Sequence, residues 1–354
     1  MRHPRAPHDR VSSAQTGFTL VELMVAMALG MLIVLALITL LVNVNRSNSE
    51  MAKTNRQIEN GRFAMQLLQR DLVHAGYWGR LGYAAGVNPL PAPTAVPSPC
   101  TSSGTWDDTY KKNLLGVPVQ GYKDLLNVFP DATTFADCGI ANLMTNSDVL
   151  VINHANTCAA GSANCSGGTD TGQHIQVSAC RNGVPPEAMF VVALRSTPPA
   201  SDSVVFPLKG KNCDPGSVAP QFKIISNIYY LALDNGQPTL MRVTLNDGAR
   251  SAPQALIEGI EAFRVEFGLD SNEDGDVDSF VKCAPCTLAE LSNTVAVKVY
   301  ILARNQLATA GYVDAKSYQL GTTAIAALND GFKRHVYSTT IRLVNPAGRR
   351  ELPL

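Results

Sequence analysis

The sequence has few charged side chains and no block of one sign. Lys and Arg number 29, as do Asp and Glu, so the formal net charge is zero, and charged residues make up only 16% of the 354 residues. A protein that binds nucleic acid through its phosphates carries clustered positive charge. The composition therefore does not predict nucleic acid as a main partner.

Motifs of common catalytic chemistry are also missing. Neither GxSxG nor GxxxxGK[ST] occurs in the sequence, so neither a nucleophile elbow nor a phosphate-binding loop is predicted. His74, His154, His174 and His335 are spread over segments of different expected structure. No enzyme is indicated, and no cofactor is implied apart from the calcium ion considered below.

One long apolar run lies near the N-terminus. Residues 18–42 contain a single charge, that of Glu22. As an α-helix this run would be about 37 Å long, which is enough to cross a hydrocarbon core of roughly 30 Å. A carboxylate inside such a helix is costly, so Glu22 is a candidate functional residue.

The residues at the start of this run, GFTLVE (17–22), resemble the class III signal of type IV prepilins. A secretory signal is cut after its apolar stretch, whereas here the small residue Gly17 precedes it. The resemblance implies that prepilin peptidase cuts after Gly17 and that the new N-terminus at Phe18 is methylated. It also implies that Glu22 meets the terminal ammonium of a neighbouring subunit. The alternative is a plain signal anchor with an incidental glutamate.

All eight cysteines follow the apolar run. They are Cys100, Cys138, Cys158, Cys165, Cys180, Cys213, Cys283 and Cys286. An even number on one side of a membrane helix predicts disulfides in an oxidising compartment such as a bacterial periplasm, with their pairing left open. Together with the prepilin resemblance, this places the leader in the cytoplasm and the body outside the inner membrane, with later transfer to the pilus fibre at the cell surface.

The sequence CAPC at residues 283–286 allows a redox, a zinc or a structural interpretation. A thioredoxin-type pair needs a helix N-terminus in a βαβ setting, and a zinc site would need a second such motif. Here the motif follows an acidic loop between predicted strands. A structural disulfide is therefore favoured.

The predicted fold class is α+β, a pilin-like long N-terminal helix packed on antiparallel β-sheet with a Cys-rich insertion of loops and strands. Residues 1–17 form the cleaved leader, and residues 18–77 form the helix, whose first part, 18–42, spans the membrane. Residues 78–220 form a Pro/Gly/Cys-rich insertion with short strands. Residues 221–354 form the sheet of the pilin core.

The helix is expected to continue beyond the membrane to about Ala75. Apolar residues recur there every seven positions, at Val44, Met51, Ile58, Met65 and Leu72, which predicts an outer half that packs on a sheet. A free coiled coil is the alternative. The sequences ENGRFA (59–64) and AGYWG (75–79) resemble the PilW type of minor pilin, and the glycines from residue 76 onward end the helix.

Strands are predicted from alternating or compact apolar segments. These segments are 147–153, 174–178, 189–195, 222–233, 239–245, 257–269, 294–303 and 336–344, and shorter apolar pieces lie at 113–119 and 125–129. The sequences DNG (234–236) and NDG (246–248) indicate hairpin turns. Segments 256–268 and 333–343 resemble strands of PilW proteins, which the J-type pseudopilins of type II secretion share.

The best ligand candidate is an acidic loop after one of these strands. Its oxygen-bearing residues are Asp270, Asn272, Asp274, Asp276 and Asp278. Their spacing, with Gly275 at the turn, follows an EF-hand loop and predicts Ca²⁺ binding. Val281 stands where that motif has its bidentate glutamate, and the alternative is a solvated acidic turn.

Taken together, the resemblance implies a minor pilin of the type IV pilus that is incorporated near the tip and helps to prime assembly. The partners it implies are the other minor pilins, the major pilin, prepilin peptidase and a PilY-type tip adhesin. Two alternatives are a J-type pseudopilin and a membrane-anchored binding or adhesion domain, with or without Ca²⁺, that never polymerises.

Overall fold

A computed structural model describes residues 17–82, 89–122, 135, 137–140, 143–144, 147–162, 171–180, 188–195, 202–282 and 286–351. The chain divides into two compact units between residues 52 and 53, and each is described by itself. Residues 1–16 of the predicted leader, the apolar piece 125–129, Cys165 and Cys283 lie outside the described residues.

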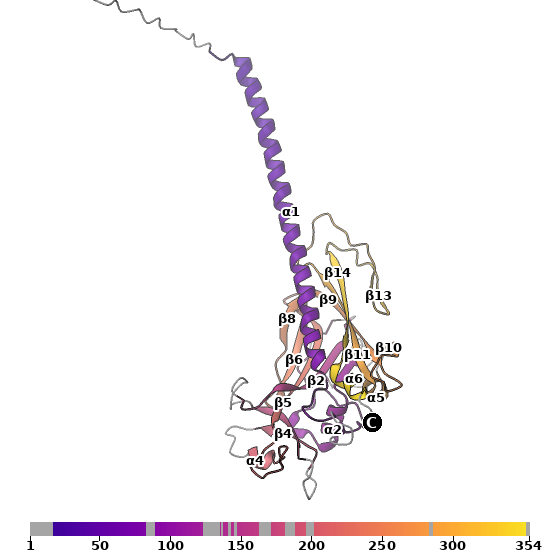
Figure 1. The fold of residues 1–354 in the computed structure, drawn as a ribbon. Helices are drawn as coiled ribbons and strands as arrows, with labels where there is room; N and C mark the ends of the chain where they lie inside the picture. Colours follow the sequence, from indigo (N-terminus) through magenta and orange to yellow (C-terminus); the bar gives the residue numbers. More distant parts are fainter. Residues whose placement is uncertain are drawn as a thin grey trace, which may run out of the picture. The chain divides into compact units, whose positions relative to one another are not determined.

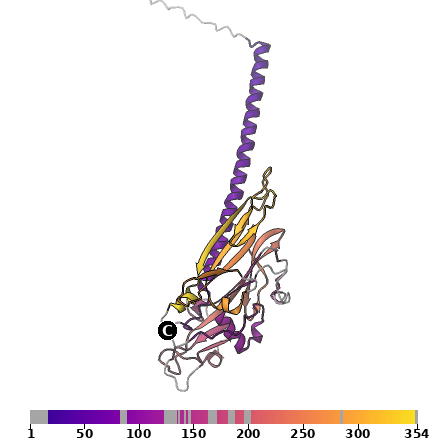
Figure 2. The same ribbon diagram turned by 90° about the vertical axis from the view of Figure 1, so that its right-hand side faces the viewer.

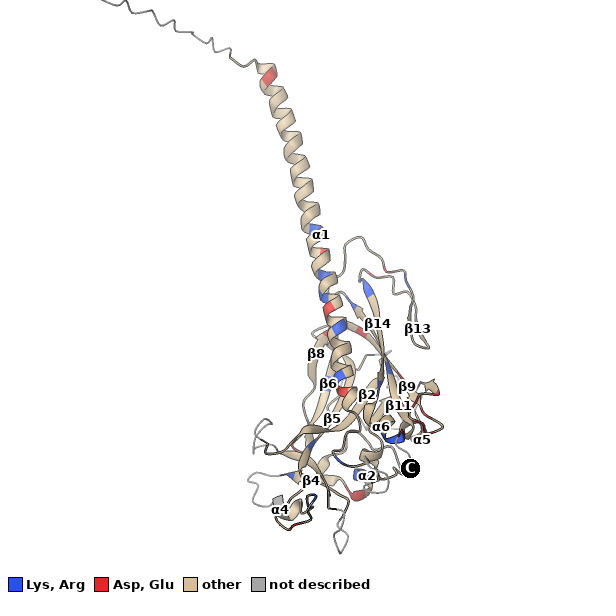
Figure 3. Cartoon of the chain, viewed as in Figure 1, with Lys and Arg blue, Asp and Glu red and all other residues tan. Residues whose placement is uncertain are grey.

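The first unit contains the beginning of α1 (Leu20–His74). From Phe18 to Val44 its large apolar side chains are all exposed, and by length and composition this segment is able to cross a membrane. Figure 3 shows the charged residues of α1 gathered in its second half, apart from one acidic position near its start. The apolar segment therefore has a large surface that no other described part of the chain covers.

The second unit begins with the remainder of α1, which packs into the core. Met65, Leu68 and Leu72 are buried, whereas Ile58, one step earlier in the seven-residue pattern, is 37% exposed. The buried face begins at Gln57, whose amide donates to the Ala303 carbonyl (2.7 Å). The prediction that the outer half of the helix packs on a sheet is thus confirmed from Gln57 onward.

The larger sheet is antiparallel and centred on β5. Its strands are β1 (Val119–Tyr122), β2 (Val149–Ala159), β3 (Gly172–Val177), β4 (Phe190–Arg195), β5 (Gln221–Asp234), β6 (Gln237–Asn246), β7 (Ala249–Arg250) and β8 (Gln254–Glu258). They follow the order β1-β2-β5-β3-β4, and β6 also pairs with β5 and carries β7 and β8. The predicted boundary at residue 221 coincides with the start of β5, yet strands from both sides of it share one sheet. The helices η1 (Ser103–Thr105) and α2 (Asp108–Gly116) precede β1 in sequence, and α4 (Asp202–Val205) lies between β4 and β5.

The smaller sheet has the order β10-β9-β11-β14 and is also antiparallel (Figures 1 and 2). Its strands are β9 (Ile260–Leu269), β10 (Ser279–Val281), β11 (Thr294–Arg304) and β14 (Arg334–Arg342). Between β11 and β14 lies a hairpin of β12 (Tyr318–Leu320) and β13 (Thr323–Ile325). The helices α5 (Leu288–Ser292) and α6 (Val344–Arg350) complete the described elements. The predicted fold class, a long helix packed on antiparallel sheet, is confirmed, with two main sheets in place of one.

The prediction of one strand over residues 257–269 is wrong. The segment contains the end of β8 and all of β9, which belong to different sheets, and Gly259 separates them with φ +80°. Its N–H donates to the Pro238 carbonyl (2.7 Å), and its carbonyl accepts from the Arg304 N–H (2.7 Å). A Cβ at this position would lie 2.8 Å from the Arg304 carbonyl oxygen. Glycine therefore lets the chain step from one sheet to the other, because L-residues avoid this conformation.

A buried ion pair joins the two sheets. Asp148, directly before β2, accepts from Arg264 (2.6 Å) and from the Val265 N–H (2.9 Å) of β9. Both charged side chains are less than 5% exposed. Burial raises the pKa of Asp148, while the positive charge of Arg264 opposes that rise. Since an unpaired charge would be costly here, this contact fixes the start of β2 against β9.

Candidate assembly site

The predicted processing residues lie at the start of the described chain. Gly17 and Phe18 precede α1, and Phe18 is 91% exposed. A Cβ added to Gly17 would meet no atom within 4 Å, so packing within the described chain does not require glycine there. Cleavage after Gly17 and methylation of Phe18 stay predictions. Cleavage would account for a small residue at position 17, whereas packing within the described chain does not.

Glu22 closes a hydrogen-bonded cap on α1. Its Oε2 accepts from the N–H and the hydroxyl of Thr19, both at 2.8 Å, and its own N–H donates to the Thr19 hydroxyl oxygen (3.2 Å). This is a capping box, in which Thr19 precedes the first helical residue and Glu22 is the third. Sequence reasoning missed this role, although T-x-x-E at residues 19–22 is its signature.

The cap leaves one oxygen of Glu22 available. All of the carboxylate's hydrogen bonds use Oε2, and Oε1 has no hydrogen-bond partner in the described chain. A positive group from another molecule would therefore find an acceptor at the first turn of an exposed apolar helix. The predicted meeting of Glu22 with a neighbour's ammonium fits this geometry and stays a prediction.

The AGYWG segment fastens the other end of α1 to the core. The Gly76 N–H donates to the Asn153 carbonyl (3.0 Å), and Arg349 of α6 donates to the Gly76 carbonyl (2.9 Å). Trp78 is fully buried, and its indole N–H donates to the Leu115 carbonyl (3.0 Å). The segment therefore has a structural role, linking α1 to β2, α2 and α6.

Asp71 lies near the end of α1, on a face that the larger sheet covers. Its side chain is 11% exposed; one oxygen lies 2.9 Å from His154 Nε2 and the other accepts from the Asn227 amide (2.9 Å). Arg62 and Arg70 of the same helix are exposed. The carboxylate at Asp71 thus connects α1 with β2 and β5.

The acidic loop is held by hydrogen bonds within the protein. Asp270 is fully buried, and its carboxylate accepts from the N–H groups of Glu273 (2.7 Å) and Gly275 (2.8 Å) and pairs with Arg350 (3.2 Å). Burial opposes ionisation of Asp270, but the bonds from Gly275, Arg350 and Glu273 outweigh it and lower its pKa. Asp278 accepts from the Ser271 N–H (2.7 Å).

The described residues contain no group of three or more His, Cys, Asp or Glu side chains arranged to hold a metal ion. Calcium binding by Asp270, Asn272, Asp274, Asp276 and Asp278 stays a prediction, and it would require Asp270 to give up its pairing with Arg350. A Ca²⁺-dependent rise in Tm that is lost in Asp274→Ala would establish it; no rise would remove it.

Two disulfides are defined by the structure. Cys100 is bonded to Cys138, and Cys180 to Cys213. Cys158 and Cys286 are also disulfide-bonded, and among the described cysteines none is free. These bonds support the structural interpretation of the cysteines.

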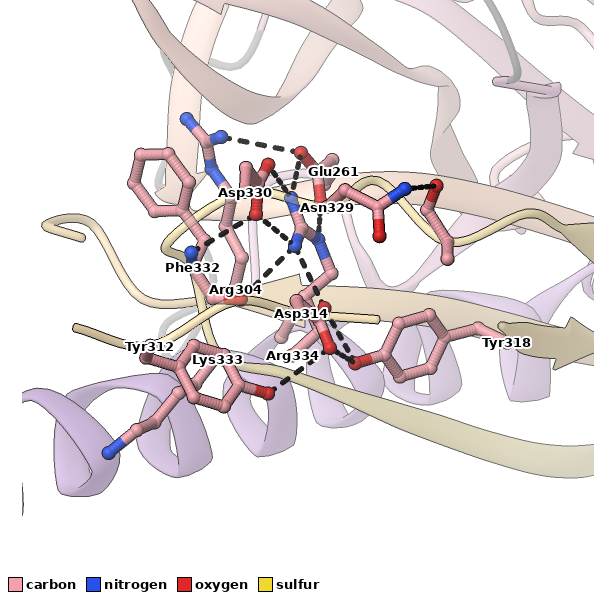
Figure 4. A network of polar contacts seen from close by, with 12 residues as sticks. Glu261, Arg304, Tyr312, Asp314, Tyr318, Asn329, Asp330, Phe332, Lys333 and Arg334 are labelled. Carbon is pink, nitrogen blue, oxygen red and sulfur yellow. Dashed lines mark hydrogen bonds and ion pairs between the residues drawn. The ribbon is translucent and has the colours of Figure 1, made fainter. Parts of the chain in front are cut away.

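A buried charged network stabilises the long connection between β11 and β14 (Figure 4). The guanidinium of Arg334, at the start of β14, is fully buried and pairs with Glu261, with Asp314 (2.9 Å) and with Asp330 (2.6 Å). Asp314 also accepts from the Tyr318 hydroxyl (2.8 Å). Sequence reasoning missed this network, because its acidic members are separated from Arg334 by 4 to 73 residues.

The charges in this network are balanced by hydrogen bonds as well as by ion pairing. Burial opposes ionisation of Asp314, but hydrogen bonds from Arg334, Tyr318 and Tyr312 outweigh it and lower its pKa. For Asp330, the hydrogen bond from Arg334 is the main cause of a lowered pKa. Through Arg334, the network therefore connects Asp314 and Asp330 of this connection to Glu261 of β9.

Comparisons with known proteins match two parts of the chain. Residues 12–41 match the model of the prokaryotic N-terminal methylation motif, and residues 228–345 match the family model described as Type IV Pilus-assembly protein W. No curated protein matches the chain. A solved structure, described as a type IV-like pilin from Thermus thermophilus, is 14% identical, with 82% of this chain and 96% of that chain covered and a TM-score of 0.35.

The N-terminal motif and the exposed helix that follows it place the chain in the class of proteins made as prepilins. Within that class, its strands from β5 to β14 are similar to those of the PilW-type pilus-assembly proteins. Its role is structural and non-enzymatic. The motif also places it at the membrane and the pilus, with prepilin peptidase as its general processing partner.

Proposed function

We propose that this protein is a minor pilin that enters the type IV pilus near its tip and helps to prime assembly. The observation that carries the proposal is the start of α1, where an apolar helix exposes its whole surface and presents one unbonded carboxylate oxygen of Glu22. Such a helix is stable in a bilayer or among other apolar helices, but not in water.

The expected sequence of events follows from these features. Prepilin peptidase removes residues 1–17 while α1 holds the protein in the inner membrane, with the second unit in the periplasm. The helix then leaves the bilayer and packs among the helices of the other minor pilins and the major pilin. Attraction between Glu22 and a neighbour's terminal ammonium is strong there, because the surroundings have a low dielectric constant. A PilY-type adhesin is a further partner at the tip.

A deletion strain tests the assignment. Sheared surface pili are quantified beside an assay of secreted proteins. We expect few or no pili with normal secretion, and traces of this protein in wild-type sheared fractions. Intact pili with exoproteins retained in the periplasm would instead favour a J-type pseudopilin. No change in either assay would favour the non-polymerising anchored domain.

The two roles of Glu22 are separable by substitution. Glu22→Gln keeps a side-chain acceptor for the cap but removes the charge, whereas Thr19→Ala removes the cap hydroxyl and keeps the charge. We expect Glu22→Gln to insert into the membrane normally and assemble poorly, while Thr19→Ala assembles nearly as the wild type does. Normal piliation by Glu22→Gln would refute the proposed ammonium contact.

A further inference from the structure

A cleft of about 390 Å³ lies beside the last turns of α1, within the second unit. The helix provides one wall with Phe63, Leu67 and Arg70, and the larger sheet provides the opposite wall with His154 of β2 and Arg242 of β6. None of the residues that line the cleft belongs to the cap at Glu22 or to the Arg334 network. Neither feature therefore accounts for the side chains found there.

Two arginines line the cleft, Arg70 and Arg242, and Arg242 also interacts with Tyr229. Arg70 is exposed, and its guanidinium makes no hydrogen bond or ion pair within the described chain. Arg242 donates through Nη2 to Gln254 (3.0 Å), while its Nε is buried without an acceptor. The acidic residue of the cleft, Asp71, is already bonded to His154 and Asn227. The cleft therefore favours a ligand that carries a carboxylate, which guanidinium groups bind with charge-assisted hydrogen bonds.

The apolar wall indicates the size of the ligand. Phe63 is 54% exposed, and together with Gln66 it also lines a second hollow of about 560 Å³ that extends back along α1 to Asn55. From Asn55 to His74 the helix rises by about 28 Å. A surface of that length fits a segment of polypeptide better than a small anion.

We propose that this cleft binds an acidic segment of a neighbouring pilus subunit, with an Asp or Glu side chain of that segment paired to Arg70 and Arg242 and an apolar side chain on Phe63. The proposal rests on the proposed function, because it takes the partner to be another subunit of the pilus. A second copy of this chain is a different occupant, which the cross-linking experiment below distinguishes.

Photo-cross-linking in piliated cells tests the proposal. The photoreactive residue p-benzoylphenylalanine replaces Phe63 in the full-length protein, and cross-linked peptides are identified by mass spectrometry. We expect adducts to a segment of another pilin-type subunit that contains Asp or Glu. Adding Arg70→Glu should lower the yield by about fivefold, as expected for reversal of one partly exposed charge. Reversing the cross-linked acidic residue to Arg should restore the yield.

The control is Arg80→Glu, which reverses an exposed arginine that does not line the cleft, and it should leave the yield unchanged. Adducts to a second copy of this chain, to a polysaccharide or to a segment without Asp or Glu would overturn the proposal, as would a yield insensitive to Arg70→Glu. The deletion strain keeps the two proposals apart: intact pili there would refute the minor-pilin role, whereas lost pili with an insensitive cross-link would refute the cleft alone.

Discussion

Gly259→Ala tests whether glycine is needed where the chain passes between the two sheets. Placing alanine at a left-handed φ costs roughly 1–2 kcal/mol. The added Cβ would lie 2.8 Å from the Arg304 carbonyl oxygen, so the backbone must move and the hydrogen bond from the Arg304 N–H to Gly259 (2.7 Å) must weaken. Weakening that bond adds about 1 kcal/mol or more. The expected loss in free energy of unfolding is therefore about 3 kcal/mol.

Gly236→Ala is the matched control. Gly236 lies in the hairpin turn between β5 and β6 with φ +76°, close to the +80° of Gly259, but a Cβ there would meet no atom within 4 Å. Its substitution carries the conformational cost alone, roughly 1–2 kcal/mol as at Gly259. The difference between the two variants therefore isolates the contact with Arg304.

The assay is thermal unfolding of the full-length protein in nonionic detergent, followed by tryptophan fluorescence. Trp78 and Trp106 are both buried, so their emission reports on the folded unit. At about 2 °C per kcal/mol for a large domain, Gly259→Ala should lower Tm by about 6 °C and Gly236→Ala by about 3 °C. Equal shifts would refute the argument that close approach to Arg304 requires glycine.

Three further predictions concern charges and disulfides. Arg334→Met should destabilise the protein by about 3–5 kcal/mol, because it leaves buried carboxylates unpaired; Arg342→Met, at a pair with Glu351 that is 47% exposed on the arginine side, should cost less than about 1 kcal/mol. The free energy of unfolding of both variants is measured by denaturant unfolding, and a similar loss in the two would contradict the stabilising role of the network. The lowered pKa of Asp314 means that the unfolded state binds more protons below about pH 4. The stability that Asp314 contributes is present above that pH and is lost as the pH falls. Asp314→Asn should therefore make the free energy of unfolding depend less on pH in the acid range. An unchanged dependence on pH would refute this prediction. Replacing Cys100 and Cys138 by serine opens a loop with a sequence separation of 38 and should cost about 4 kcal/mol, which a Tm equal to that of the wild type would rule out.

The elements of this protein could be predicted from sequence where their signal is local. The alternation of Val295, Val297 and Val299 marks the buried face of β11, and all three are buried. At residues 234–236 the sequence DNG requires left-handed backbone, which Asn235 and Gly236 adopt between β5 and β6. The membrane-spanning run needs no tertiary information at all, because its meaning depends on length and composition alone.

Contacts between distant segments could not be predicted in this way. Periodicity shows that a segment is half-buried, but it does not show which strand lies beside it. The apolar pattern continues through Gly259, so it did not indicate that the chain passes there from one sheet to the other. The same holds for Asp71, whose charge pattern fits a solvated helix face until β2 brings His154 to it across 83 residues.

By itself, then, the sequence determined the long helix, its membrane segment, the strands, the turns and the signal that starts the chain. The tertiary structure alone decided the step between sheets, the pairing of Cys100 with Cys138, the charges around Arg334 and the cleft between Arg70 and Arg242. The physical reason is the same in each case: burial periodicity and turn chemistry act over a few residues, whereas these contacts depend on which surfaces meet once the chain has folded.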